Sequence, residues 1–381
     1  MFIAKICCVL CGPNTNLLKQ DFLQQKLDER IQLNAYRQLK LPGESIDFCS
    51  NDYLGIVTNN LLHHSSDELR SGSTGSRLLA GNYILIEETE RFVAKFHRAE
   101  AGLMFNSGYD ANLGLLSAVP RRGDMVLYDY LSHASIRDGI RLSFAQAFSF
   151  LHNDLEDLEK KLKQSHTGSI HQLFVVTESV FSMDGDMAPL NEISALCEKY
   201  DALLIVDEAH ATGVVGEKGE GLVQELHLEE KCFARVHTFG KACGCHGAIV
   251  LSSELLRNYL INFSRPFIYT TALPEASVIA IRTAYEVFPA LWAERKHLSW
   301  LIDNFQRANI SHQKLKGNTP IQVVVIPGND DAKACADTCQ QHNLDVRAIL
   351  YPTVPKGSER LRIVLHAFNS REELDRLIQL L

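Results

Sequence analysis

An acid and a lysine that each follow a short apolar run are the residues best suited to carry chemistry in this sequence. Residues 203–206 lead into Asp207 and His210, and the strand-like residues 234–239 precede Lys241 in a loop rich in glycine and cysteine. Ligands of open α/β sheets bind at the carboxyl ends of the strands. A lysine among small, apolar neighbours is partly desolvated, which lowers its pKa and favours Schiff-base formation. An acid for a ring nitrogen and a lysine for an aldehyde are what a protein supplies to pyridoxal 5'-phosphate (PLP).

Each of these features also has a second interpretation. A strand that ends in Asp-Glu-x-His occurs in nucleotide-binding proteins, where the acid holds Mg²⁺, and a lone lysine near glycines is most often a solvated loop residue. The sequence contains no Gly-Lys-Ser or Gly-Lys-Thr loop, so a P-loop nucleotide hydrolase is disfavoured. A protein that keeps such a fold for binding alone, without catalysis, is the alternative from another class.

A phosphate site is predicted at residues 106–109, Asn-Ser-Gly-Tyr, which form a turn between a predicted strand and a predicted helix. Backbone N–H groups at a helix N-terminus have no intrahelical acceptor and, together with the helix dipole, bind anions. We therefore expect Gly108 and Tyr109 to contact a phosphate, while Ser107 can equally be an ordinary N-cap. The glycine-rich residues 72–82 match neither the dinucleotide nor the Walker pattern.

Strand-like and helical segments alternate from residue 102 to residue 206, which predicts an α/β fold with a mainly parallel sheet wrapped by helices. The pattern changes near residue 288 to a smaller α+β unit. The predicted parts are 1–50 as an N-terminal extension and helical arm, 51–287 as the large cofactor-binding domain, and 288–381 as the small C-terminal domain. We also predict an amphipathic helix over 21–40 and a strand that leads into a turn over 265–274.

The bulk composition restricts the location and the partners. A net charge of −8 over 381 residues argues against nucleic acid as a main partner. No apolar run is long enough to span a bilayer, and the apolar N-terminus is too short for a signal peptide. Ten cysteines without a disulfide-type spacing fit a reducing, cytoplasmic location. Cys7, Cys8 and Cys11 have no nearby fourth ligand, so no metal site is predicted.

Six segments, taken in order, carry a family resemblance: SNDYLG, SHAS, TESVFSMDGDMAPL, VDEAHATGVVGEKGEG, TFGKACGCHGA and PTVPKGSERLR. From about residue 23 to its end the chain resembles the α-oxoamine synthases. These are fold-type I PLP-dependent transferases that condense an amino acid with an acyl thioester and release CO₂. The resemblance implies a cytoplasmic homodimer with shared active sites. It is greatest to members that use L-alanine and a pimeloyl thioester, carried by coenzyme A or an acyl carrier protein; the alternative is glycine or a different acyl thioester.

The resemblance also implies roles for individual residues. Lys241 would hold the cofactor aldehyde, Asp207 would pair with the protonated ring nitrogen, and His133 would stack on the ring and approach the acyl substrate. The other residues implied in cofactor binding are Gly108, Tyr109, Ser179, His210, Thr238, Thr270 and Thr271, the last two toward the neighbouring subunit. Those implied in substrate binding are Arg37, Asn51, Thr353 and Arg362. Arg362 matches the arginine that binds the amino-acid carboxylate, and its neighbour Arg360 is the alternative.

Overall fold

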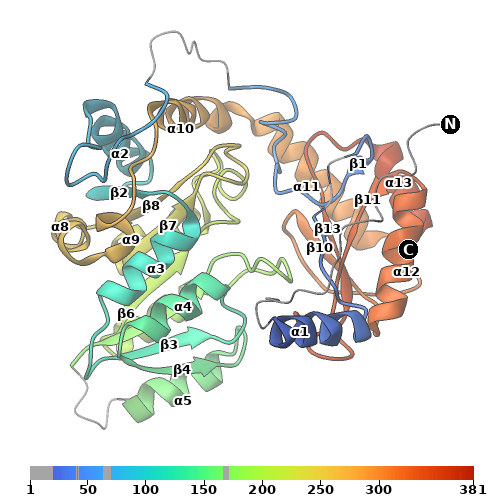
Figure 1. The fold of residues 1–381 in the computed structure, drawn as a ribbon, viewed down its shortest axis with the longest axis horizontal. Helices are drawn as coiled ribbons and strands as arrows, with labels where there is room; N and C mark the ends of the chain where they lie inside the picture. The colour runs from blue at the N-terminus through green and yellow to red at the C-terminus, as the bar shows by residue number, and fades with distance from the viewer. Residues whose placement is uncertain (1–19, 40, 42, 63–69, 166–170) are drawn as a thin grey trace, which may run out of the picture.

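The computed structural model describes residues 20–39, 41, 43–62, 70–165 and 171–381. The cysteines at 7, 8 and 11 therefore lie outside the described residues. The chain forms a large domain around one sheet and a small domain around another (Figure 1). In the large domain seven strands follow the order β2-β8-β7-β6-β5-β3-β4. They are β2 (Ala101–Phe105), β3 (Met125–Asp129), β4 (Gln146–Phe150), β5 (Leu173–Glu178), β6 (Leu203–Asp207), β7 (Cys232–Thr238) and β8 (Ala248–Ser252).

The large sheet is mainly parallel, as predicted. Strands β4, β3, β5, β6 and β7 pair in parallel, and only β8 runs antiparallel to both of its neighbours, β2 and β7. Strands β2 and β5 are buried along their whole length. A continuous apolar run is typical of a strand that is covered on both faces, and this accounts for the short apolar runs in the sequence.

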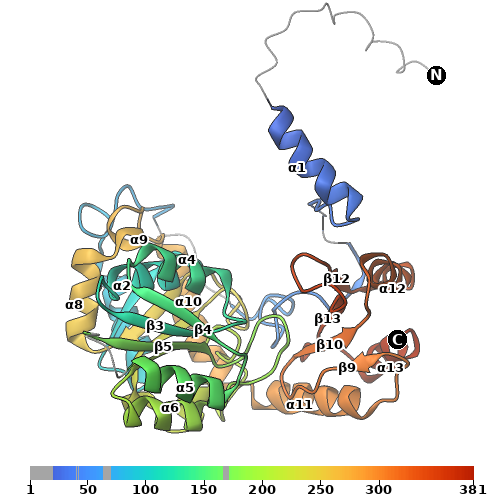
Figure 2. The same cartoon turned by 90° about the horizontal axis from the view of Figure 1, so that it is seen from below.

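Helices cover both faces of this sheet (Figures 1 and 2). Successive strand side chains point to opposite faces, so Val126 and Leu127 enter different cores: Val126 packs with α3 and α4, and Leu127 with α5 and α6. The helices of the large domain are α2 (Ile84–Phe96), α3 (Gly108–Ala118), α4 (Ala134–Leu142), α5 (Leu155–Ser165), α6 (Leu190–Lys199), α7 (Leu222–Glu225), η1 (Glu229–Lys231), α8 (Glu254–Phe263), α9 (Arg265–Ile268) and α10 (Glu275–Val287).

The small domain has an antiparallel sheet in the order β12-β13-β10-β9. Its elements are η2 (Phe288–Ala290), α11 (Trp292–Arg307), β9 (Gln313–Lys314), β10 (Ile321–Val325), α12 (Asn329–Gln341), β11 (Leu344–Asp345), β12 (Arg347–Ile349), β13 (Arg360–Val364) and α13 (Arg371–Gln379). Strand β1 (Ile46–Asp47) pairs in parallel with β11, and the Val364 N–H donates to the Phe48 carbonyl (2.9 Å). These contacts join residues 46–48 to the small domain.

Helix α1 (Asp21–Gln32) is shorter than the predicted 21–40. The chain leaves the helix at Leu33 and Asn34, which has a positive φ of 49°. None of the α1 residues is buried, and its apolar stripe of Leu23, Leu27 and Ile31 is exposed. Figure 2 shows α1 standing away from both domains. The helix therefore has an apolar face that this single chain does not cover.

The prediction of a strand over 265–274 was wrong, because the segment begins with α9. Pro266 lies in the first turn of α9, where its missing N–H costs nothing and its fixed φ suits a helix. Among the described helices, none combines the length and the apolar character needed to cross a membrane.

Candidate active site

A cavity of about 200 Å³ lies at the carboxyl ends of the parallel strands. Its wall includes Lys241, Asp207, His133, His210 and Thr238, all of them residues that the sequence analysis singled out. Because β6 and β7 are neighbours in the sheet, the acid that ends β6 and the lysine that follows β7 reach the same space. The cavity is therefore where the predicted chemistry would take place.

Asp207 is buried at the end of β6. Its Oδ2 accepts a hydrogen bond from Asn112 Nδ2 (2.6 Å), and its Oδ1 accepts one from the Ala209 backbone N–H (2.8 Å). Two donors that face a carboxylate stabilise its charged form and fix its orientation. Asp207 thus provides a fixed negative charge in the cavity wall.

Lys241 is half-buried, and Glu178 lies with it in the cavity wall. Burial lowers the pKa of the Lys241 ammonium, against the attraction of Asp207 and Glu178, and the Arg362 charge adds to the lowering. Burial next to Asp207 raises the pKa of Glu178 to about 8. Near neutral pH Glu178 is therefore mostly protonated, and Asp207 carries the negative charge.

A directed chain of hydrogen bonds joins Asp207 to His133. Asn112 Nδ2 donates to Asp207 and to Ser135 Oγ (3.0 Å), and Ser135 Oγ lies 2.8 Å from His133 Nδ1. An amide nitrogen can only donate, so the Ser135 hydroxyl accepts from Asn112. His133 Nδ1 accepts from the Ser135 backbone N–H (3.3 Å), so this nitrogen carries a lone pair and the Ser135 hydroxyl donates to it as well. Burial lowers the pKa of His133; Asp207 opposes this effect and Lys241 adds to it. The ring is thus neutral, with its proton on Nε2.

His210 is buried and neutral. Burial holds the pKa of its imidazole well below the usual range, and the charges of Lys241 and Arg362 add to this effect. Its Nδ1 lies 2.6 Å from the hydroxyl of Tyr53, which is fully buried. The other ring nitrogen, Nε2, has no hydrogen-bond partner within the described chain, so it is available to a ligand in the cavity.

The predicted phosphate turn lines the same cavity through Ser107, Gly108 and Tyr109. Ser107 is the N-cap of α3 and accepts from the Asp110 N–H (3.1 Å), which confirms the N-cap interpretation of this turn. A Cβ on Gly108 would lie 2.4 Å from Thr238 Cγ2. The absence of a side chain at Gly108 is therefore what lets the turn approach Thr238.

Arg362 and Arg360 lie on the same face of β13 and reach the large domain differently. Arg362 donates from Nε to the Ser182 carbonyl (2.8 Å) and from Nη2 to Asn51 Oδ1 (3.1 Å). Arg360 is buried and pairs with the Asp184 carboxylate. Because Arg362 has only neutral partners, it retains an unpaired charge for a carboxylate, whereas the charge of Arg360 is neutralised.

The two residues predicted to contact the acyl substrate lie together, although neither lines the cavity. Arg37 follows α1, and Thr353 follows β12 in the small domain. The Arg37 Nη2 donates to Thr353 Oγ1 (2.9 Å). The segment after α1 is in this way attached to the small domain.

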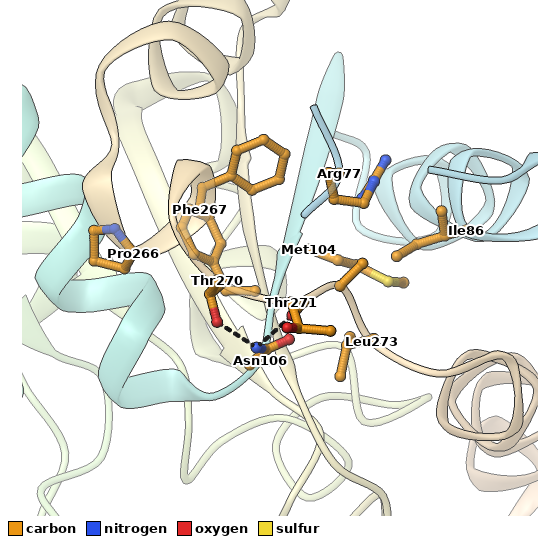
Figure 3. Close-up of a pocket in the computed structure, with 11 residues that line it drawn as sticks. Arg77, Ile86, Met104, Asn106, Pro266, Phe267, Thr270, Thr271 and Leu273 are labelled. Carbon is orange, nitrogen blue, oxygen red and sulfur yellow. Dashed lines mark hydrogen bonds between the residues drawn. The ribbon is translucent and has the colours of Figure 1, made fainter. Parts of the chain in front are cut away.

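Five other predicted residues are absent from the cavity wall: Asn51 and Arg362, described above, and Ser179, Thr270 and Thr271. Ser179 is fully buried, and its hydroxyl donates to the Asp207 carbonyl (3.3 Å), so it turns away from the space it was expected to reach. Thr270 and Thr271 accept hydrogen bonds from Asn106 Nδ2, the latter through its carbonyl. They line a separate cavity of about 10 Å³ (Figure 3), which holds at most one water molecule.

Four residues of the site, Glu178, Asn112, Ser135 and Tyr53, were given no role from the sequence. A signal existed for two of them. Glu178 ends β5 as Asp207 ends the neighbouring β6, and Asn112 follows Gly108 by one helical turn, on the same side of α3. Nothing in the pattern distinguishes the hydroxyls of Ser135 and Tyr53 from structural ones.

The donor set fits PLP. The cofactor needs an amine for its aldehyde, an anion for its ring nitrogen and N–H donors for its phosphate. Lys241, Asp207 and the first turn of α3 supply these groups around one cavity, and Gly108 provides a close approach that a Cβ would fill. The cavity volume of about 200 Å³ is also several times the volume of roughly 30 Å³ that one water molecule occupies in the liquid.

Comparison with known proteins agrees with this geometry. Residues 44–381 match the family aminotransferase class I and II. The chain is 41% identical to 8-amino-7-oxononanoate synthase of Emericella nidulans over 94% of each chain. It is also similar to the solved serine palmitoyltransferase of Sphingomonas wittichii (TM-score 0.84, 29% identity, 96% of this chain and 97% of that one). A serine palmitoyltransferase solved with PLP as an internal aldimine matches at a TM-score of 0.81 and 26% identity over 96% and 97%.

Proposed function

Because the chain belongs to the aminotransferase class I and II family and, within it, to the PLP-dependent α-oxoamine synthases, we propose that it condenses L-alanine with a pimeloyl thioester. The products would be 8-amino-7-oxononanoate, CO₂ and the free thiol of the carrier, a step of biotin biosynthesis. The relative that is 41% identical supports this choice of substrates. The observation that carries it is one cavity that holds Lys241 and Asp207, next to an arginine with no carboxylate partner.

Bound PLP supplies an aldehyde that condenses with amines and a protonated ring that withdraws electrons from the α-carbon of the amino acid. Asp207 would keep a proton on the ring nitrogen. The first turn of α3, with Gly108 and Tyr109, would bind the phosphate, together with Thr238. His133 would lie beside the ring, with its Nε2–H available to donate to the acyl carbonyl.

Lys241 has two tasks that both need a neutral amine. Its lowered pKa raises the fraction of free amine near neutral pH. The Nζ lone pair would then be available to hold the cofactor aldehyde and, in a second role, to accept the α-proton of the amino acid as a base. Arg362 of the small domain and Asn51 of the large domain would bind the carboxylate of L-alanine, which would hold the α-carbon within reach of Nζ.

The enzyme is a homodimer in this proposal. Two observations support it: α1 exposes an apolar stripe that the chain itself does not cover, and Thr270 and Thr271 lie outside the cavity of their own chain. The two threonines would contribute to the site of the partner subunit. Arg37 and Thr353 would meet the acyl substrate near the small domain.

A substrate panel tests the function. L-alanine, glycine and L-serine are each combined with pimeloyl and acetyl thioesters, on coenzyme A and on acyl carrier protein, and the release of thiol and CO₂ is measured. We expect L-alanine with the pimeloyl thioester to give the highest kcat/KM. A preference for glycine with the acetyl thioester would instead identify a 2-amino-3-oxobutyrate-forming enzyme. Lys241→Ala should abolish turnover and the yellow absorbance, and Lys218→Ala, at an exposed lysine, should change neither.

A further inference from the structure

The Tyr53 side chain links His210, in the cavity wall, to the pair of Asn51 and Arg362. Tyr53 itself does not line the cavity. Its hydroxyl lies 2.6 Å from His210 Nδ1 and 3.2 Å from Asn51 Oδ1. The same Asn51 oxygen accepts from Arg362 Nη2 (3.1 Å). We propose that Tyr53 is a positioning residue that fixes the tautomer of His210 and couples it to the state of Arg362; the functional meaning of this coupling rests on the proposed function.

The hydrogen-bond partners give the direction of the bond between Tyr53 and His210. The amide oxygen of Asn51 can only accept, so the single hydroxyl proton of Tyr53 is donated to Asn51 Oδ1 (3.2 Å). The Tyr53 oxygen therefore accepts at the 2.6 Å contact, and the donor is His210 Nδ1–H. The second lone pair of Asn51 Oδ1 accepts from Arg362 Nη2.

The proton of the neutral His210 ring is consequently on Nδ1. The other nitrogen, Nε2, has no protein partner among the described residues, and His210 lines the cavity. Nε2 is therefore an acceptor toward any donor placed there. If the hydroxyl of Tyr53 were missing, nothing in the described chain would hold the proton on Nδ1.

The coupling to Arg362 follows from the charge of its guanidinium. Burial raises the pKa of the Tyr53 phenol, and Arg362 opposes this by direct hydrogen bonding and by its charge. A phenol polarised in this way is a stronger donor to Asn51 Oδ1 and a weaker acceptor for His210 Nδ1–H. When a substrate carboxylate binds Arg362, it draws on the same guanidinium, so the strength of the bond between Tyr53 and His210 changes with substrate binding.

Ring nitrogen shifts of ¹⁵N-histidine-labelled, cofactor-free protein test this proposal, with His210 assigned by His210→Gln. In the unsubstituted protein we expect Nδ1 to show the shift of a protonated nitrogen and Nε2 that of an unprotonated one. Tyr53→Phe removes only the hydroxyl and should move the proton partly to Nε2. Tyr83→Phe is the matched control, because it removes a hydroxyl that donates to the Leu273 carbonyl, outside the cavity.

A double-mutant cycle tests the coupling. Arg362→Lys should shift the His210 Nδ1 resonance when Tyr53 is present and leave it unchanged in the Tyr53→Phe background. The proposal is overturned if Tyr53→Phe leaves both ring nitrogens of His210 unchanged, or if Arg362→Lys acts equally in both backgrounds. Because this measurement uses no substrate, a different substrate choice in the panel would alter the proposed function and leave this result intact. Equal melting temperatures of the variants would show that the fold is retained.

Discussion

The cavity wall contains the carboxyl groups of Asp207 and Glu178, the cation of Lys241 and the neutral imidazoles of His133 and His210. Each of these groups influences the protonation state of its neighbours. The Asp207 carboxylate accepts hydrogen bonds from two donors. Glu178 accepts a hydrogen bond from the backbone N–H of His133 (2.6 Å). Burial and the neighbouring Asp207 therefore place the proton on Glu178. The consequence is a single negative charge next to Lys241, which is what a cationic ring requires.

The stability of the cofactor-free protein should depend on Glu178 in a definite pH range. The pKa of this group is raised in the folded state from an ordinary 4.5 to about 8. Its stabilising contribution is fully present below pH 4.5 and is lost as the pH rises to about 8, because only the unfolded chain gives up the proton readily.

Glu178→Gln keeps the acceptor for the His133 N–H and removes the titration. We expect the melting temperature of the unsubstituted protein to fall relative to that of Glu178→Gln between pH 5 and pH 8, values that lie on the titration of this group. Glu217→Gln, at an exposed glutamate, is the control. A constant difference between the two curves over this range would contradict the protonated state assigned to Glu178.

At the scale of elements, the approach of the α3 N-terminus to the end of β7 determines whether the phosphate turn can form. An added Cβ on Gly108 would lie 2.4 Å from Thr238 Cγ2, so one of the two elements has to move. Gly108→Ala should weaken PLP binding by roughly tenfold or more, the equivalent of about 1.4 kcal/mol, measured by absorbance titration. Gly72→Ala is the matched control, since a Cβ there would meet nothing within 4 Å. Equal affinities for both variants would remove Gly108 from the phosphate site.

Helix α1 is the element whose stability depends most on the proposed partner. Leu27→Ser together with Ile31→Ser should shift the monomer–dimer equilibrium toward monomer, because each apolar side chain contributes about 1.5–3 kcal/mol when fully buried. Sedimentation velocity over a concentration series measures the shift. The control is Gln25→Ser on the polar face of the same helix. An unchanged dissociation constant would show that the apolar stripe does not contact the partner.

The sequence predicted the regular elements better than the irregular ones. The acid at 207, the lysine at 241 and the turn at 108 follow apolar strands, and the rule that ligands bind at strand ends locates them together. Residues 265–274 are apolar enough to suggest a strand, but Pro266 and the preceding helix favour another helical turn. Ser179 and Tyr53 show what the sequence could not predict, because the spacing of residues does not reveal whether a hydroxyl near the site points into the cavity or away from it.

At the scale of the whole molecule, the site is assembled from both domains. The large domain supplies the groups around the cofactor, and β13 of the small domain supplies Arg362, which lies against Ser182 and Asn51. Arg360 and Asp184 join the domains at the same place. Substrate binding and domain contact therefore use adjacent residues of one strand.

Replacing each of these two arginines by alanine in turn separates substrate binding from domain contact. Arg362→Ala should raise the KM for the amino acid at least tenfold and leave the melting temperature nearly unchanged, since a charge with no carboxylate partner is removed. Arg360→Ala should lower the melting temperature, because it leaves Asp184 buried without its cation, a loss of about 3–5 kcal/mol for a fully buried pair. Steady-state kinetics and thermal melts measure both. If only Arg360→Ala affects the KM, the carboxylate site belongs to Arg360.

The position of β8 between β2 and β7 also determines when the site can exist during synthesis. Strand β2, which leads into the turn at Gly108, joins the sheet only through β8, and β8 follows Lys241 in the chain. A nascent polypeptide whose β8 is still inside the ribosome can have made every cofactor-binding residue named above except Thr270 and Thr271, yet it cannot bring the two ends of the vitamin-binding pocket together. Assembly of the pocket therefore has to wait until β8 has left the ribosome.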